Sequence, residues 1–174
     1  MTSATPLDES ATEHDGGADQ RRIIECHNPA NGQFIAQINA ATPDEIADAV
    51  SAARRSFRAW RRLDVEQRCD ILLEARDVLL EHRGELLELL QVETGKARLD
   101  AQSELLTIFE TLRYYTSKAP EFLADETVRA HLFKNKRVRV QYEPMGVVVN
   151  ISPWNFPLEL SISPAIPALA AGNS

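Results

Sequence analysis

Apolar positions recur at three- and four-residue steps through most of residues 43–118, a spacing that predicts successive amphipathic helices. The first helix is expected to begin at Pro43, with Thr42 as its N-cap and Glu45 as the capping-box partner. Its apolar residues share one face: Ile46, Ala49, Val50, Ala53, Phe57 and Trp60. One side of this helix is therefore expected to pack against other parts of the protein.

Three further helical segments follow the first. Asp64, with Gln67 three residues later, marks a second start, and Gly95 can end a third helix in the left-handed conformation. A last helix is expected over about residues 98–118, with Pro120 just beyond it. Together these segments predict a continuous helical region.

Three other segments have the period or composition of strands. Two short apolar runs flank residues 28–32, which contain Asn-Gly and predict a hairpin turn. Apolar and polar residues alternate over 137–142, which we expect to pair with 126–133 as a second hairpin. Residues 146–151, GVVVNI, form a β-branched run typical of a parallel strand buried on both faces by helices. We find no other credible parallel strand, so the sheet is expected to be incomplete.

Composition narrows the class of protein. The formal net charge of −7 argues against a nucleic-acid partner, and the basic patch 134–139 is interpreted as a solvated strand edge. Neither a membrane span nor a signal sequence is found, and Cys26 and Cys69 have no metal-binding or disulfide spacing. We expect a soluble, cytoplasmic protein without a metal site. Residues 1–20 are expected to form a disordered acidic tail.

The sequence SPWNFP, residues 152–157, carries the strongest chemical signal. Asn155 would follow the buried strand at its carboxyl end, where open α/β sheets bind ligands. Pro153 and Pro157 restrict the backbone on either side, so the amide could donate to developing oxygen charge without reorganisation. The alternative is a simple turn in which Asn155 shapes the backbone and Trp154 packs in a core.

Five motifs in order resemble the N-terminal part of an NAD(P)-dependent aldehyde dehydrogenase, over about residues 21–174. They are NPANG (28–32), ETGKA (93–97), EPMGVV (143–148), SPWNFP (152–157) and PALAAGNS (167–174). The resemblance implies an α/β fold: the first part of a Rossmann-like cofactor-binding domain, with an incomplete sheet and a β-hairpin oligomerisation arm. The implied division is a tail (1–20), a hairpin and helical part (21–126), an arm (127–144) and the first strand and helix of the nucleotide-binding sheet (145–174).

The resemblance also implies roles for individual residues. Asn155 would donate its amide to the aldehyde oxygen while a cysteine attacks the carbonyl carbon; hydride then passes to NAD or NADP, and a glutamate-activated water releases the acid. The backbone near the cofactor would be that of Ile151, Ser152, Pro153 and Trp154. The substrate passage would be lined by Phe156, Glu159, Leu160 and Ser163. A homo-oligomer would form through residues 131–144.

The chain departs from the family pattern in what it lacks. The family's nucleophilic cysteine, general-base glutamate and glycine-rich phosphate turn are expected downstream, so these 174 residues alone should be inactive. Cys26 and Cys69 are rejected as nucleophiles, and Lys96 is interpreted as a surface residue. Two alternatives stay open: a truncated, non-catalytic subunit that docks on full-length relatives, and an enzyme that passes its acyl group to coenzyme A.

Overall fold

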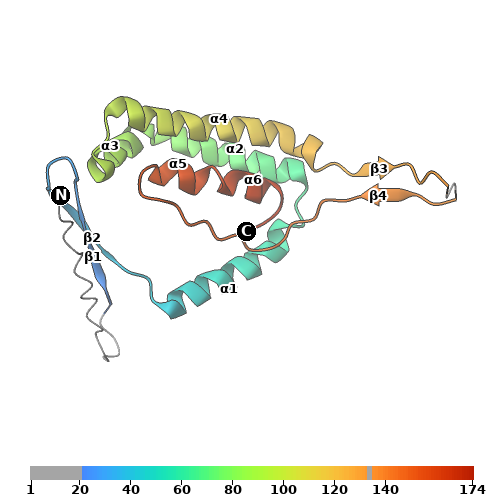
Figure 1. Ribbon diagram of the computed structural model, residues 1–174, viewed down its shortest axis with the longest axis horizontal. Helices are drawn as coiled ribbons and strands as arrows, with labels where there is room; N and C mark the ends of the chain where they lie inside the picture. Colours follow the sequence, from blue (N-terminus) through green and yellow to red (C-terminus); the bar gives the residue numbers. More distant parts are fainter. Residues whose placement is uncertain (1–20, 133–134) are drawn as a thin grey trace, which may run out of the picture.

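The computed structural model describes residues 21–132 and 135–174, and the expected acidic tail lies outside them. Its elements follow the order β1 (Ile23–His27), β2 (Phe34–Asn39), α1 (Pro43–Trp60), α2 (Val65–Glu81), α3 (Arg83–Thr94), α4 (Arg98–Phe122), β3 (Glu126–Val128), β4 (Val138–Val140), α5 (Pro157–Ile162) and α6 (Ala165–Ala170). In Figure 1, α5 and α6 lie between the α2–α4 pair and α1. No helix in the described part is long and apolar enough to cross a membrane.

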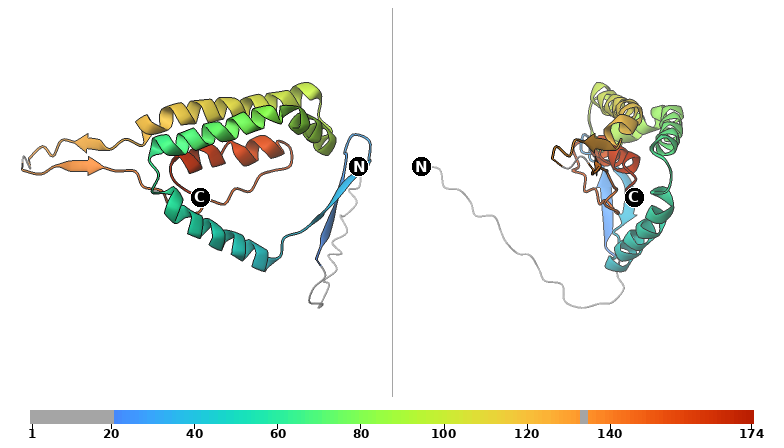
Figure 2. Two further views of the ribbon diagram at one scale, coloured as in Figure 1. Left: turned by 180° about the vertical axis from the view of Figure 1, so that it is seen from behind. Right: turned by 90° about the vertical axis from the view of Figure 1, so that its right-hand side faces the viewer.

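Both predicted hairpins are confirmed. Strands β1 and β2 pair antiparallel around a turn in which Gly32 has a φ of 72° and donates to the carbonyl of Asn28 at 2.7 Å. Strands β3 and β4 also pair antiparallel, with Thr127 opposite Arg139. Viewed from either side, this second hairpin extends away from the helices (Figures 1 and 2). It therefore forms an arm, whose apolar residues stay exposed in this chain.

The predicted helix starts are also confirmed. At the start of α1, the Thr42 hydroxyl accepts from the Glu45 N–H at 3.2 Å, and the Glu45 carboxylate accepts from the Thr42 N–H at 3.0 Å. Asp64 and Gln67 form the same reciprocal arrangement at α2. Because these bonds satisfy orphan donors of the first turn, the two starts are fixed locally by sequence.

The core lies among α2, α3, α4 and α6. Its buried apolar residues are Cys69, Leu72, Leu87, Leu90, Ala101, Leu105, Ile108, Leu112, Ala119, Ile166 and Ala170. Two side chains hold the end of α6 to the preceding helices: the Trp60 indole donates to the Leu169 carbonyl at 2.9 Å, and Arg68 Nε donates to the Ala170 carbonyl at 2.9 Å. Helix α1 has no fully buried residue, so its apolar face is only partly covered.

One predicted helix end is wrong. Helix α4 continues past residue 118 and includes Pro120. Proline removes only its own backbone donor, and the Leu123 N–H still donates to the Ala119 carbonyl at 2.9 Å. The last turn therefore persists beyond the proline.

The strand predicted at 146–151 is not formed. The segment has no regular secondary structure, and Val149 and Ile151 are 70% and 88% exposed rather than buried. Two backbone bonds do reach it: Val148 N–H donates to the Ser174 carbonyl at 2.8 Å, and Ser174 N–H donates to the Gly146 carbonyl at 3.0 Å. This is the pattern of one parallel pairing, and a single pairing is too little to make a strand ladder.

Candidate functional site

Asn155 lies in the irregular loop that precedes α5. As predicted from the two prolines, Asn155 is kept out of the helix, which begins at Pro157. Trp154 is 87% exposed, so the alternative that it packs in a core is wrong. The Asn155 backbone carbonyl accepts from Lys96 Nζ at 3.1 Å, whereas its carboxamide has no hydrogen-bond partner within the described ranges. The loop thus fixes the backbone and leaves the amide available.

Lys96 is not the surface residue that the sequence suggested. Its side chain is only 11% exposed, and Nζ donates to Glu104 Oε2 at 2.5 Å. The same ammonium group lies 4.6 Å from the centre of the Phe156 ring, within range of a cation–π contact. Gly95, with a φ of 67°, ends α3 and redirects the chain so that Lys96 faces α4 instead of solvent.

Glu104, a residue of α4, was missed by the sequence reasoning. Its side chain is fully buried, and its Oε1 accepts from the N–H groups of Leu158 and Glu159 at 2.8 and 3.0 Å. A signal was present, because Glu104 stands three residues after Ala101 and four before Ile108, on the buried stripe of α4. An acidic residue on such a stripe requires buried partners.

The residues expected near a cofactor lie on the same loop, and all of them except Ser152 are exposed. Ile151 is 88% exposed, Pro153 is exposed, and the Ser152 hydroxyl lies 2.8 Å from that of Ser161. Within the described part of the chain, the backbone N–H groups of Ile151, Ser152 and Trp154 donate to no other group. Their free donors fit a ligand that approaches through the backbone.

The residues expected along a substrate passage lie at or near α5. Phe156 is 41% exposed, and Glu159, Leu160 and Ser163 are half-buried. The Ser163 hydroxyl oxygen is buried and finds no hydrogen-bond partner among the residues described. These four residues therefore lie on one segment, directly after Asn155.

The two cysteines differ in their surroundings. Cys69 is 4% exposed in the core, and this burial raises the pKa of its thiol, which disfavours the nucleophilic thiolate. Cys26 is partly exposed and lines a hollow of about 360 Å³ together with Thr94 and Trp154. Asn155 does not line this hollow.

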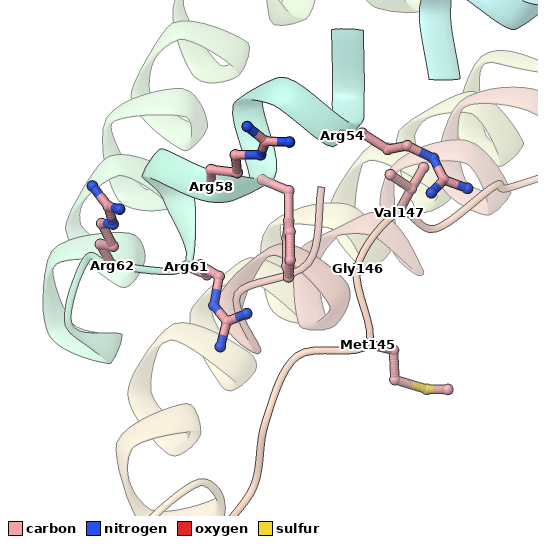
Figure 3. Close-up of a pocket in the computed structure, with 8 residues that line it drawn as sticks. Arg54, Arg58, Arg61, Arg62, Met145, Gly146 and Val147 are labelled. Carbon is pink, nitrogen blue, oxygen red and sulfur yellow. The ribbon is translucent and has the colours of Figure 1, made fainter. Parts of the chain in front are cut away.

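A larger hollow, of about 750 Å³, lies between the end of α1 and residues 145–147. Its cationic lining consists of Arg54, Arg58, Arg61 and Arg62. Figure 3 shows these side chains pointing in different directions. The Arg61 guanidinium lies 5.3 Å from the centre of the Phe57 ring. The four cations do not converge on one anion position, so we assign no site here.

The sequence motifs meet in two groups. A Cβ added at Gly95 would lie 3.1 Å from the Ala30 backbone nitrogen, so the motifs NPANG and ETGKA are in close contact. Lys96 of ETGKA binds the backbone of Asn155 in SPWNFP. Elsewhere, the Gly146 N–H donates to Asn173 Oδ1 at 3.0 Å, which joins the third motif to the last.

The sequence matches the aldehyde dehydrogenase family over residues 17–174. The chain belongs to the aldehyde dehydrogenase family. A similar curated relative is the Mycolicibacterium smegmatis protein named putative succinate-semialdehyde dehydrogenase (NADP(+)), 39% identical over 143 residues, which are 82% of this chain and 28% of the relative. The chain thus spans about a quarter of that relative's length.

Solved aldehyde dehydrogenase structures share the arrangement described above. An NADP-dependent glyceraldehyde-3-phosphate dehydrogenase from Bacillus halodurans, solved with NADP, is 30% identical with a TM-score of 0.81, over 88% of this chain and 33% of that chain. An NAD-dependent benzaldehyde dehydrogenase from Corynebacterium glutamicum is 33% identical with a TM-score of 0.80, over 87% and 33%. The aldehyde dehydrogenase fold is therefore confirmed, with its sheet incomplete in this chain.

Proposed function

We propose that the protein carrying this chain oxidises an aldehyde to a carboxylic acid with NAD or NADP, and that Asn155 is its oxyanion donor. One observation carries the proposal: Lys96 holds the backbone carbonyl of Asn155, while the Asn155 carboxamide has no hydrogen-bond partner among the described residues. Family membership supplies the reaction class.

Asn155 would act when a nucleophile attacks the aldehyde carbon. Negative charge then develops on the aldehyde oxygen, and a carboxamide N–H already in place stabilises it without reorganisation. Removing one such donor typically lowers kcat by about 10²–10³. A bound NAD or NADP would supply the hydride acceptor. The backbone N–H groups of Ile151, Ser152 and Trp154, which donate to no other group in the described part of the chain, are the ones that would contact it.

The nucleophile and general base are not assigned to residues of this chain. Cys69 is buried, and the hollow that Cys26 lines is not lined by Asn155. The proposal therefore concerns the whole protein, and its first test uses material isolated from the native source, with the intact mass recorded beside the assay. Aldehyde-dependent formation of NADH or NADPH with release of the acid supports the proposal. Formation of an acyl-coenzyme A product would instead assign the protein to the coenzyme A-acylating aldehyde dehydrogenases. The absence of any turnover would contradict the proposal.

Substrate choice would be influenced by Glu159. This carboxylate, half-buried in the first turn of α5, would disfavour acidic aldehydes such as succinate semialdehyde, which the M. smegmatis relative's name specifies. Changing Glu159 to Gln should raise kcat/KM for succinate semialdehyde by about tenfold relative to a neutral aldehyde of similar length, equivalent to about 1.4 kcal/mol. An equal change for both aldehydes would exclude Glu159 from the passage.

The arm formed by β3 and β4 is proposed to join subunits of a homo-oligomer. Val138, Val140 and Tyr142 are 42%, 41% and 50% exposed along one side of it, and no further strand of the described residues pairs with either edge of the hairpin. Sedimentation should detect an oligomer that Val140→Lys dissociates, whereas Arg137→Ala, on the other side, leaves it intact. A monomeric unmodified protein would refute this part of the proposal.

A further inference from the structure

We propose that Lys96 and Glu104 are positioning residues whose buried ion pair holds the loop that carries Asn155. In this proposal, the ion pair contacts no reacting group and acts only through the backbone of residues 155–159. Its catalytic consequence rests on the proposed function, but the holding of the loop does not.

Both side chains of the pair are removed from water. The side chains of Lys96 and Glu104 are 11% and 0% exposed, and charges removed from water are tolerated only when their hydrogen-bonding groups are satisfied. Other ion pairs of the described chain lie at the surface; Lys118 and Glu121, three residues apart on the same helix α4, are 45% and 68% exposed. A surface pair of that kind contributes little, so the buried pair has a different status.

The hydrogen bonds of the pair lead to the Asn155 loop and the start of α5. Glu104 Oε1 accepts from the N–H groups of Leu158 and Glu159, and Lys96 Nζ donates to the Asn155 carbonyl. The remaining bond, between Nζ and Oε2, joins the two charged groups to each other. The Lys96 backbone N–H also donates to the Thr94 hydroxyl at 3.4 Å. All other hydrogen bonds of the two side chains reach the loop and the first turn of α5.

Among the described residues, few other side chains fix this part of the loop. The other side-chain ties start earlier: Asn150 Nδ2 donates to the Leu160 and Ser161 carbonyls, and Ser152 contacts Ser161. Within the described residues, Asn155 itself is bonded to the protein only through Lys96. A displacement of about 1 Å at a reacting centre can cost about 10²-fold in rate, so this tie is enough to matter.

Amide hydrogen exchange of Leu158 and Glu159, measured in the protein isolated from its source and in purified variants, tests the proposal directly. The first N–H groups of a helix have no partner within the helix, so slow exchange there reports the Glu104 carboxylate. Changing Glu104 to Ala should accelerate exchange at both amides by about tenfold or more, in line with the loss of a charge-assisted hydrogen bond. Lys96→Met should have a similar effect, because it leaves the carboxylate buried without its cation.

The matched control is Lys118→Met, which removes a lysine from an exposed pair on α4 and should leave the exchange of Leu158 and Glu159 unchanged. The indole N–H of Trp60, bonded to the Leu169 carbonyl, checks that the remainder of the fold persists. Lys96→Arg keeps the charge and should retain most of the protection. Fast exchange of both amides in the unmodified protein, or unchanged exchange in Lys96→Met and Glu104→Ala, would overturn the proposal.

Kinetics separates positioning from a purely structural role. For Lys96→Met we expect kcat for the aldehyde to fall by about 10²-fold while the KM for NAD or NADP changes less than about twofold, because only the oxyanion donor is displaced. Lost protection with unchanged kcat would refute the positioning role. If the unmodified protein oxidises no aldehyde, the proposed function fails, whereas the exchange results still decide whether the pair holds the loop.

Discussion

Arg68 provides a direct test of how α2 holds the end of α6. This residue of α2 is 6% exposed, and its guanidinium donates to two backbone carbonyls, those of Leu63 and Ala170. The second bond joins α2 to the end of α6, 102 positions later in the chain. Changing Arg68 to Met keeps an unbranched side chain of similar length but removes both donors.

The expected cost follows from the two abandoned carbonyls. A buried acceptor without a partner costs about 1–3 kcal/mol, and bonds from charged donors contribute at the upper end of the usual range. Burial of the guanidinium is itself unfavourable, as shown by the lowered pKa of Arg68, which is caused mainly by desolvation. Replacing the charged group with an apolar one therefore recovers part of the lost stability. The net loss in the free energy of unfolding should be about 2–4 kcal/mol.

Urea unfolding followed by circular dichroism measures this loss. The matched control is Arg83→Met: Arg83 also donates to a backbone carbonyl, that of Leu80 at 2.9 Å, but it is exposed, so its removal should cost about 0.5 kcal/mol or less. Equal costs for the two variants would refute the argument that burial of the acceptor determines the effect.

Three further predictions concern local features. The Thr42 backbone N–H donates to the Glu45 carboxylate, so the pKa of Glu45 should lie below its ordinary value. The stability that this bond gives the folded state should be present above the ordinary pKa and lost as pH falls through the lowered pKa. Thr42→Ala should destabilise α1 by about 1 kcal/mol, yet an NMR titration should show that the pKa of Glu45 stays lowered for the most part, because the backbone N–H remains. Gly95→Ala should cost more in thermal unfolding than Gly32→Ala, since both have positive φ but only Gly95 has atoms within 3.1 Å of the added Cβ, and equal losses would contradict the contact. Ser163→Ala should be neutral or stabilising, because its buried hydroxyl lacks a partner in the described chain; a loss above about 1 kcal/mol would reveal a partner.

Sequence was sufficient where structure depends on neighbours along the chain. Thr42 with Glu45, and Asp64 with Gln67, fix helix starts through bonds between residues three apart. The left-handed Gly95 was predicted for the same reason, since few other residues adopt that conformation readily.

Sequence failed where the outcome depends on distant partners. The run 146–151 has the composition of a buried strand, but a strand requires neighbours, and among the described residues only Ser174 forms backbone hydrogen bonds with it. The sequence around Lys96 predicts a surface residue because its partners, Glu104 and Asn155, lie 8 and 59 positions away. The resemblance to a family identified Asn155, but only the structure connects it to the buried pair.

The central claim is that the Asn155 carboxamide stabilises the aldehyde oxygen, and the ratio of kcat between the unmodified protein and Asn155→Ala tests it most directly. The exposed Asn39, at the end of β2, supplies the control Asn39→Ala, which should keep full activity. We predict that Asn155→Ala lowers kcat for aldehyde oxidation by about 10²–10³ with little change in the KM for NAD or NADP. A kcat within a factor of about three of the unmodified protein would contradict the account.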